Sequence, residues 1–188
     1  MKSLRFILLL LSLTSLISCG GALLPGSSDP YKKIEYMSTA MAQGRWIPAE
    51  RYVREALAIF KERNDKQGIA DAYIAYGQYY KYGGWCKFEK DFCPKGSISR
   101  PKSIEYFKKA AVIFKNLNSN FGEARAYFGL ASAYGGGGQF AESCKTFDKA
   151  LIAYKKGKGK EKPFPFNRNF NSFEEMVNAF KEKACSQA

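Results

Sequence analysis

The sequence has no histidine among its 188 residues. Histidine is the most common general base and metal ligand, so its absence excludes Ser/His/Asp and Cys/His catalytic arrangements. The glycine-rich run 135–138 lacks the Lys-Ser/Thr ending of a phosphate-binding loop. Acidic pairs such as Glu174 and Glu175 are expected on solvent-exposed helix faces. The sequence therefore predicts a protein that is not an enzyme and that holds no metal or cofactor.

The sequence also lacks an apolar run long enough to cross a membrane. The longest, from Phe6 to Ile17, has about a dozen residues, whereas a transmembrane helix needs about 20. Lys2 and Arg5 precede it, which gives the charged start and short apolar core of a secretory signal peptide. We therefore expect residues 1–18 to be removed on export.

The end of this segment resembles the lipobox of bacterial lipoproteins. Leu16 is the aliphatic residue of that motif, Ser18 is the small residue before the cysteine, and Cys19 is the cysteine. The resemblance implies that Cys19 becomes the N-terminus, carries lipid including palmitate, and anchors the chain in the cell envelope. Gly20 stands where an aspartate would favour the inner membrane, which implies the outer membrane, facing the periplasm or the cell surface.

Two alternatives remain for this segment: an ordinary signal peptide, with Cys19 in a disulfide, and an uncleaved anchor. In either case residues 19–29 are small and turn-forming, without a period that would bury one face. We expect them to form a flexible tether.

Positive charge predominates. The sequence has 30 Lys and Arg residues and 17 Asp and Glu residues, which gives a net charge of +13. Loss of Lys2 and Arg5 with the signal peptide would leave about +11. Such a charge suits nucleic acid, anionic lipid or anionic polymer as a partner. Export makes nucleic acid the poor choice, so the charge predicts lipid headgroups or cell-wall polymer.

Two periods run through the sequence. At an offset of 54, the residues Ile59, Phe60, Lys61, Asn64, Gly68, Ala70, Ala72 and Tyr73 recur unchanged as Ile113, Phe114, Lys115, Asn118, Gly122, Ala124, Ala126 and Tyr127. At an offset of 40, the matching pairs are Gly44 with Gly84, Ser103 with Ser143, Phe107 with Phe147, and Ala110 with Ala150. A unit of 40 residues, with an insertion of about 14 residues between Gly84 and Ser103, explains both periods.

The residue types within this unit resemble the tetratricopeptide repeat (TPR) in its 40-residue form. The third unit matches best, through Tyr127, Leu130, Ala131, Tyr134, Gly138, Phe140, Ser143, Phe147, Ala150 and Leu151. The first unit departs from the pattern at Met37, where a small residue is expected. The resemblance implies an all-α fold, a right-handed solenoid of about three helical hairpins over residues 30–156. The expected units are 30–63, 70–117 with an insertion at 85–100, and 124–156.

Small residues at the hairpin positions would let two helices approach closely. We expect Tyr134, Phe147 and Ala150 to be buried where the two helices of the third hairpin meet. The run 135–138 is expected to form the turn between these helices.

The end of the chain is expected to cap this stack, because a hairpin alone cannot bury its apolar face. A basic loop over 157–171 leads to a capping helix within 172–188. Ser172 and Glu175 form a capping box at its start. An apolar stripe would cover the third hairpin; its members are Phe173, Met176, Val177 and Phe180.

The chain has five cysteines. With Cys19 lipidated, four remain, and in an oxidising compartment this even number suggests disulfides with three possible connectivities. Cys86 and Cys93 lie together in the insertion, and pairing them leaves Cys144 to join Cys185. The second bond would fasten the capping helix to the third hairpin. The alternative is a zinc site of all four cysteines, which the absence of a CxxC pair disfavours.

In the TPR family the first helix of each hairpin lines a concave binding surface. The groove positions of that family fall here on Tyr31, Ile34, Ser38, Met41, Asp71, Ile74, Gln78, Tyr82, Arg125, Phe128 and Ser132. This set lacks the Lys, Asn and Arg arrangement that clamps a C-terminal carboxylate, which favours a peptide with apolar anchors.

The resemblance therefore implies a membrane-anchored scaffold or adaptor of the bacterial envelope that binds a protein or peptide partner. Secretion, pilus and cell-wall assembly are the processes it would serve. The alternative is a structural or adhesive surface lipoprotein that binds anionic polymer or lipid through its lysines.

Overall fold

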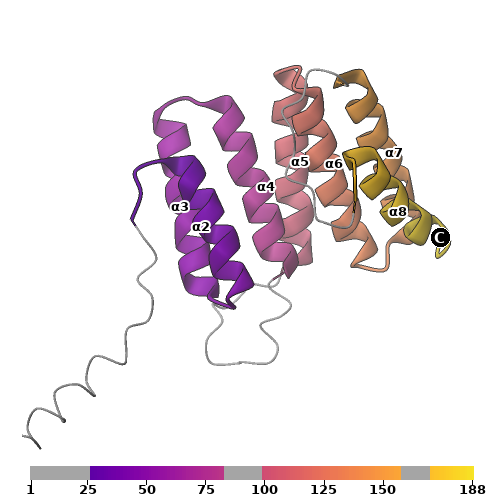
Figure 1. Cartoon of the computed structure of the whole chain (residues 1–188), viewed down its shortest axis with the longest axis horizontal. Coiled ribbons are helices and arrows are strands. Elements are labelled where there is room, and N and C mark those ends of the chain that lie inside the picture. The colour runs from indigo at the N-terminus through magenta and orange to yellow at the C-terminus, as the bar shows by residue number, and fades with distance from the viewer. Residues whose placement is uncertain (1–25, 83–98, 158–169) are drawn as a thin grey trace, which may run out of the picture.

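The computed structural model of the chain describes residues 26–82, 99–157 and 170–188. Within these ranges the chain is all-helical, without strands, as predicted. The helices are α2 (Pro30–Ala42), α3 (Trp46–Glu62), α4 (Lys66–Tyr82), α5 (Arg100–Asn116), α6 (Asn120–Gly135), α7 (Phe140–Gly157) and α8 (Phe173–Cys185). Each described helix packs against the next along the chain, and they stand in a row (Figure 1).

Several predicted features lie outside the described residues. They are the signal peptide 1–18, the lipidation site Cys19, Cys86 and Cys93 with most of the insertion, and most of the basic loop. Of the expected insertion 85–100, the last two residues are described: Ser99 caps α5 and Arg100 begins it. No described helix is both long enough and apolar enough to cross a bilayer.

Two turns between helices have the same backbone geometry. Asn64 after α3 has φ 51° and Asn118 after α5 has φ 53°, a left-handed conformation that asparagine tolerates better than most residues. In each turn the N–H of the next residue donates to the carbonyl of Phe60 or Phe114 at 2.9 Å. Each asparagine therefore ends its helix in the same way, and the 54-residue period reflects this repeated turn.

A second kind of turn follows α2 and α6. Gly44 and Gly138 adopt φ 71° and 75°, where a side chain would be strained. Arg45 and Gln139 then donate backbone hydrogen bonds back into the preceding helix, at 2.8 and 3.0 Å. The glycine-rich run 135–138 thus contains the end of α6 and the turn to α7, as predicted.

Two buried serines set the contact between paired helices. Ser103 Oγ on α5 donates to the carbonyl of Gly77 on α4, and Ser143 Oγ on α7 donates to that of Ala131 on α6, both at 2.8 Å. The serines are 40 residues apart and their acceptors 54 apart, because the insertion lies between Gly77 and Ser103. The pair α4 and α5 therefore repeats the packing of α6 and α7.

The core consists of clusters between neighbouring helices. Met37, the departure from the repeat pattern, is fully buried with Trp46 and Tyr79. Phe147 and Ala150 are buried in the cluster that joins α6, α7 and α8, as predicted. The prediction for Tyr134 was wrong: it is half-buried and packs against the cluster formed by α4, α5 and α6. Its position on α6 turns it toward α5 and not toward α7.

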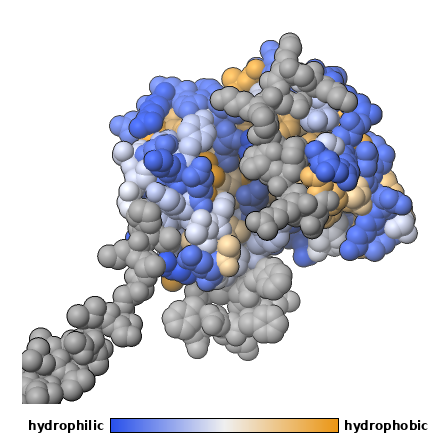
Figure 2. All heavy atoms as spheres, viewed as in Figure 1, coloured by the Kyte–Doolittle hydropathy of each residue, from blue (hydrophilic) through white to orange (hydrophobic). Residues whose placement is uncertain are grey.

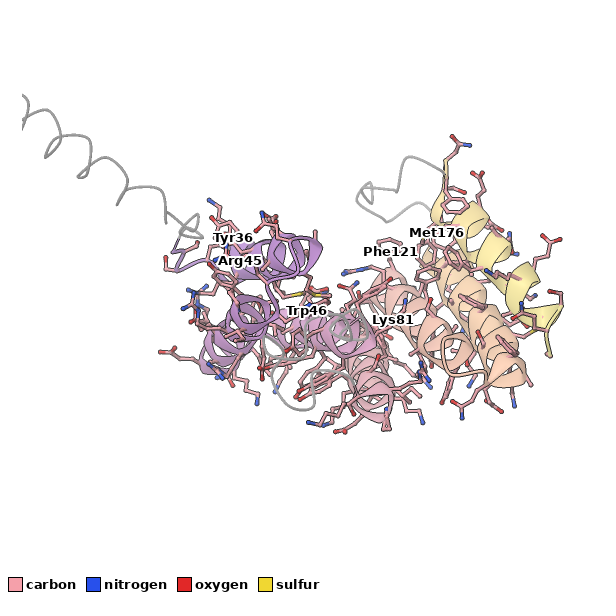
Figure 3. The ribbon with its side chains drawn as sticks, turned by 90° about the horizontal axis from the view of Figure 1, so that it is seen from below. Tyr36, Arg45, Trp46, Lys81, Phe121 and Met176 are labelled. Carbon is pink, nitrogen blue, oxygen red and sulfur yellow. A yellow bond between two sulfur atoms is a disulfide. The ribbon has the colours of Figure 1, made fainter. Side chains whose placement is uncertain are left out.

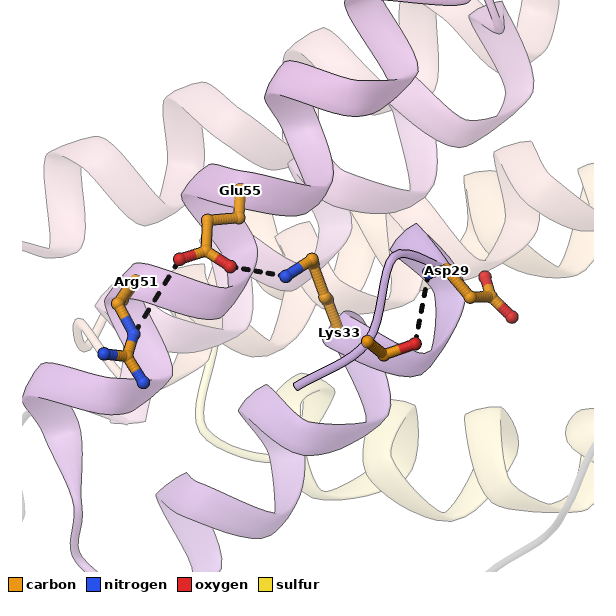
Figure 4. Close-up of polar contacts among 5 residues, drawn as sticks. Asp29, Lys33, Arg51 and Glu55 are labelled. Carbon is orange, nitrogen blue, oxygen red and sulfur yellow. Dashed lines mark hydrogen bonds and ion pairs between the residues drawn. The ribbon is translucent and has the colours of Figure 1, made fainter. Parts of the chain in front are cut away.

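An ion-pair network joins α2 to α3 (Figure 4). The ammonium of Lys33, a buried residue, binds the carboxylate of Glu55, which also lies 3.8 Å from Arg51 Nε. Asp29 caps α2 by accepting from the backbone N–H of Tyr31 at 2.9 Å. These contacts fix the first helix of the described chain against the second.

Helix α8 covers the side of α6 and α7, as the capping prediction requires. Ser172 Oγ accepts from the N–H of Glu175 at 3.0 Å, and Phe173, Met176 and Val177 are buried. Phe180 departs from the prediction because 44% of it remains exposed. The apolar residues in the first turns of α8 are therefore more completely buried than Phe180 near its end.

A disulfide fastens the other end of α8. Cys185 is bonded to Cys144 on α7, with a Cα–Cα distance of 5.0 Å, as predicted. The zinc site of four cysteines is therefore wrong, because bonded sulfurs are not thiolate ligands. Lys181 adds an ion pair to Asp148 at 2.6 Å, and Lys155 one to Glu174 at 3.5 Å.

Candidate binding cleft

A cleft of about 280 Å³ lies between α4, α6 and α8. Its lining is Ile74, Gln78, Lys81 and Tyr82 of α4, Phe107 of α5, Arg125, Phe128 and Gly129 of α6, and Phe173 and Met176 of α8. Seen from below, α2 and α8 stand on either side of α4 and α6, with Met176 beside Phe121 (Figure 3). The cleft is small for a ligand pocket, since such pockets start at about 300 Å³, and suits one or two large side chains.

Most of the predicted groove residues on α4 and α6 meet in this cleft. Those that line it are Ile74, Gln78, Tyr82, Arg125 and Phe128. Ser132 lines a separate hollow of about 490 Å³, which shares Lys81 with the cleft and extends to Phe180 and Lys183. Asp71 is not part of the cleft lining, but it accepts a hydrogen bond from Arg125, which is.

The predicted groove residues on α2 do not line the cleft. Tyr31 is 45% exposed, and its ring packs edge-on against Phe60 at 4.9 Å. Ile34 and Met41 are half-buried against the core formed with α3. Ser38 is exposed and donates to the carbonyl of Ile34 at 3.2 Å. The cleft is thus formed by α4 and the described helices that follow it, and not by α2.

An ion pair crosses from α6 to α4 at the cleft. Arg125 donates to Asp71 Oδ1 at 3.0 Å, and Gln67 donates to Asp71 Oδ2 at 3.3 Å. Only 13% of the Asp71 side chain and 30% of the Arg125 side chain are exposed. Burial raises the pKa of Asp71 above its ordinary value, and Arg125 and Gln67 offset this shift only in part. The pair therefore holds a largely buried charge at one side of an apolar cleft.

Aromatic rings form much of the wall of the cleft. A methyl group on Gly77 would stand 2.8 Å from the Phe107 ring, and one on Gly129 only 2.2 Å from it. Phe107 therefore fits between α4 and α6 only because both positions are glycine. Phe128 lies 5.7 Å from Phe147, 5.9 Å from Phe173 and 5.6 Å from Phe180, measured between ring centres.

Sequence reasoning did not assign several lining residues to the site. Phe173 and Met176 were expected only to cover the third hairpin, yet they also form one wall of the cleft. The apolar stripe of α8 is visible in the sequence, but the stripe alone does not indicate that its residues both cover the third hairpin and line the cleft. Lys81, Phe107 and Gly129 were not predicted as site residues, because the projected positions came from one face of each first helix.

The cleft is mainly apolar, with Lys81 and Arg125 as its cations and polar groups on Gln78 and Tyr82. The space-filling view shows hydrophobic residues reaching the surface on the α8 side, among hydrophilic ones (Figure 2). Among the described residues, no three His, Cys, Asp or Glu side chains gather as a metal site would require. No protein-family model matches the chain, and no curated protein matches it.

Proposed function

We propose that the chain is a membrane-anchored interaction protein of the bacterial cell envelope, and that its cleft binds an apolar peptide segment of a partner protein. The cleft carries the proposal, because residues projected as a peptide groove line it together with Phe173 and Met176. Its size suits side chains of a peptide, and its polar groups lie beside an apolar floor.

The fold that we propose is a right-handed solenoid of three TPR-like hairpins, α2 with α3, α4 with α5 and α6 with α7. The repeated hydrogen bonds of Ser103 and Ser143 support it, since they give two pairs the same packing. Contacts of α2 with α4, α4 with α6 and α6 with α8 also support it, because stacked hairpins bring their first helices together.

The membrane anchor that we propose is lipid on Cys19, in the outer membrane. Its support is the lipobox-like end of residues 1–18. Such an anchor would hold the cleft near a partner protein of a secretion, pilus or cell-wall assembly. The proposed role requires no catalysis by the protein.

Photo-crosslinking in intact envelopes tests the cleft. Tyr82 and Tyr31 are equally exposed, at 44% and 45%, but only Tyr82 lines the cleft. With benzoylphenylalanine at position 82, we expect capture of a discrete partner even when the envelopes are irradiated at high salt. We expect no such capture from position 31. A bulky Gln78→Trp change should abolish the capture, whereas Gln139→Trp in the α6–α7 turn should not. Equal capture from both positions, or capture unaffected by Gln78→Trp, would refute the proposal.

A further inference from the structure

The helices that supply most of the cleft lining carry no excess of positive charge. Helices α4, α6 and α8 together carry five Lys and Arg and five Asp and Glu. Helix α5 alone carries five cations and a single acidic residue, Glu105. Helix α5 therefore has a net charge of +4, and it contributes only Phe107 to the cleft.

A second recess lies beside α5, between it and α3. It consists of two hollows of about 590 and 460 Å³ that share Tyr73 and Ile113. The first is lined by Lys61, Asn64, Lys66, Ile69, Asn116 and Leu117 besides the shared pair. The second adds Glu105, Lys108, Lys109 and Val112. We call the two together the α3–α5 groove.

This groove combines an apolar floor with a rim of lysines. Val112 and Leu117 are 59% and 41% exposed, so two aliphatic side chains reach the surface among these lysines. Glu105, the acidic residue of the lining, binds Lys109. The ammonium of Lys109 also lies 6.0 Å from the centre of the Tyr73 ring.

We propose that the α3–α5 groove binds the headgroup region of anionic phospholipid, so that this face of the protein lies against a membrane surface. Every cation of its lining is lysine, a mobile point charge, and no arginine fork is present there for fixed two-point binding of a carboxylate. Lysines attract an anionic headgroup layer, while their stems lie on apolar groups beneath.

The exposed aliphatic residues favour lipid over a soluble polyanion. Val112 and Leu117 would leave water on contact with acyl chains at a bilayer surface, but a polyphosphate chain offers them nothing apolar. Tyr73 lines both hollows, and tyrosine is a residue type that is enriched where membrane meets water. This inference stands apart from the peptide cleft, which uses other residues.

The test uses the full chain reconstituted into vesicles, with benzoylphenylalanine at position 112. Position 47 is the matched control, because Ile47 is also 59% exposed and lies at the start of α3, outside the groove. We expect lipid adducts from position 112 in vesicles containing phosphatidylglycerol, far fewer in vesicles of phosphatidylcholine alone, and few from position 47. Adducts would be quantified by mass spectrometry of the irradiated protein.

Charge reversal then separates the groove from general attraction. Lys66→Glu with Lys108→Glu should lower the adduct yield about tenfold or more, since each lysine contributes to binding at an anionic surface. Lys66 is the first residue of α4, where a carboxylate suits the helix dipole, so folding should persist, as thermal melting would verify. The control, Lys145→Glu with Lys149→Glu on α7, changes the net charge equally and should leave the yield unchanged.

Three results would overturn the proposal. Equal losses from the groove and α7 variants would mean that only net charge matters. Displacement of the lipid by soluble polyphosphate at equal phosphate concentration would assign the groove to anionic polymer. Capture of a protein, and not of lipid, from position 112 in native envelopes would assign it to an acidic peptide.

Discussion

Arg125 on α6 donates a hydrogen bond of 3.0 Å to Asp71 on α4, and the two positions are separated by 54 residues. That separation equals the longer sequence period, so the bond joins equivalent positions of successive units. It therefore links neighbouring helix pairs at the cleft.

Asp71 should make stability depend on pH in a definite direction. Because burial raises its pKa above 3.8, the folded state binds a proton more tightly than the unfolded state. The contribution of Asp71 to stability should therefore decrease as pH rises from about its ordinary pKa through its raised value. Urea unfolding of the wild type and of Asp71→Asn at several pH values would isolate the contribution of Asp71 to the free energy of unfolding. A free-energy difference that moves in favour of the wild type as pH rises would contradict this prediction.

Gly129→Ala should destabilise the fold by about 1–3 kcal/mol, because its methyl group would stand 2.2 Å from the Phe107 ring, in the range of overpacked cores. Gly136→Ala is the control. Its φ of −63° suits alanine, and the nearest atom to the added carbon is 3.4 Å away. We expect the control to be neutral or slightly stabilising in thermal unfolding. Equal behaviour of both variants would mean that Phe107 can move aside.

Ala150→Arg should cost several kcal/mol, because position 150 is fully buried and an arginine there would place an unpaired charge in the core. Ile152→Arg, two residues away on α7, replaces a side chain that is 56% exposed and should cost little. Melting temperatures of the two variants give the comparison. An unchanged value for Ala150→Arg would show that α7 does not pack as described.

Loss of the disulfide should release the end of α8. Cys144 and Cys185 are 41 residues apart, and closing a loop of that size stabilises by about 4 kcal/mol in the chain-entropy model. Cys185→Ser should lower stability and expose Phe173 and Val177, so that aggregation increases. Light scattering during heating would measure the aggregation.

Peptide mapping without reductant should find the Cys144–Cys185 bond itself. Crossed pairs with Cys86 or Cys93 would contradict the prediction.

Cys19→Ala tests the lipid anchor. If the lipobox is read correctly, the variant should accumulate as an unprocessed precursor and take up no labelled palmitate. Gel mobility and metabolic labelling report these two properties. A variant that is processed normally would exclude a lipidated Cys19.

The turn at 135–138 and the small-residue contacts could be predicted because the sequence displays the residues that make them. Asn64 and Asn118 were identified only as a recurring pair, although asparagine tolerates the left-handed conformation that both adopt. The starts of two helices were less visible. The expected units began at 70 and 124, but α4 begins at Lys66 and α6 at Asn120. The Asp65 side chain accepts the N–H of Gly68 at 2.8 Å and so supports the earlier start of α4.

The composition of the cleft could be predicted only in part. The projection identified Ile74, Gln78 and Phe128 because their helices follow the repeat. It did not include Phe173 and Met176, because these residues were expected only to cover the third hairpin, and their approach to α4 depends on how α8 packs in three dimensions. Tyr134 shows the same limit: the face on which a half-buried ring lies depends on how both neighbouring helices pack.

Helix α8 both closes the row of helices and supplies one wall of the cleft through Phe173 and Met176. A further helix pair inserted after α7 would carry these two side chains away from Arg125 and Phe128. The length of the row and the lining of its cleft can therefore not vary independently. A chain with an added pair would have to form this wall of the cleft from new residues, even if every existing helix were kept.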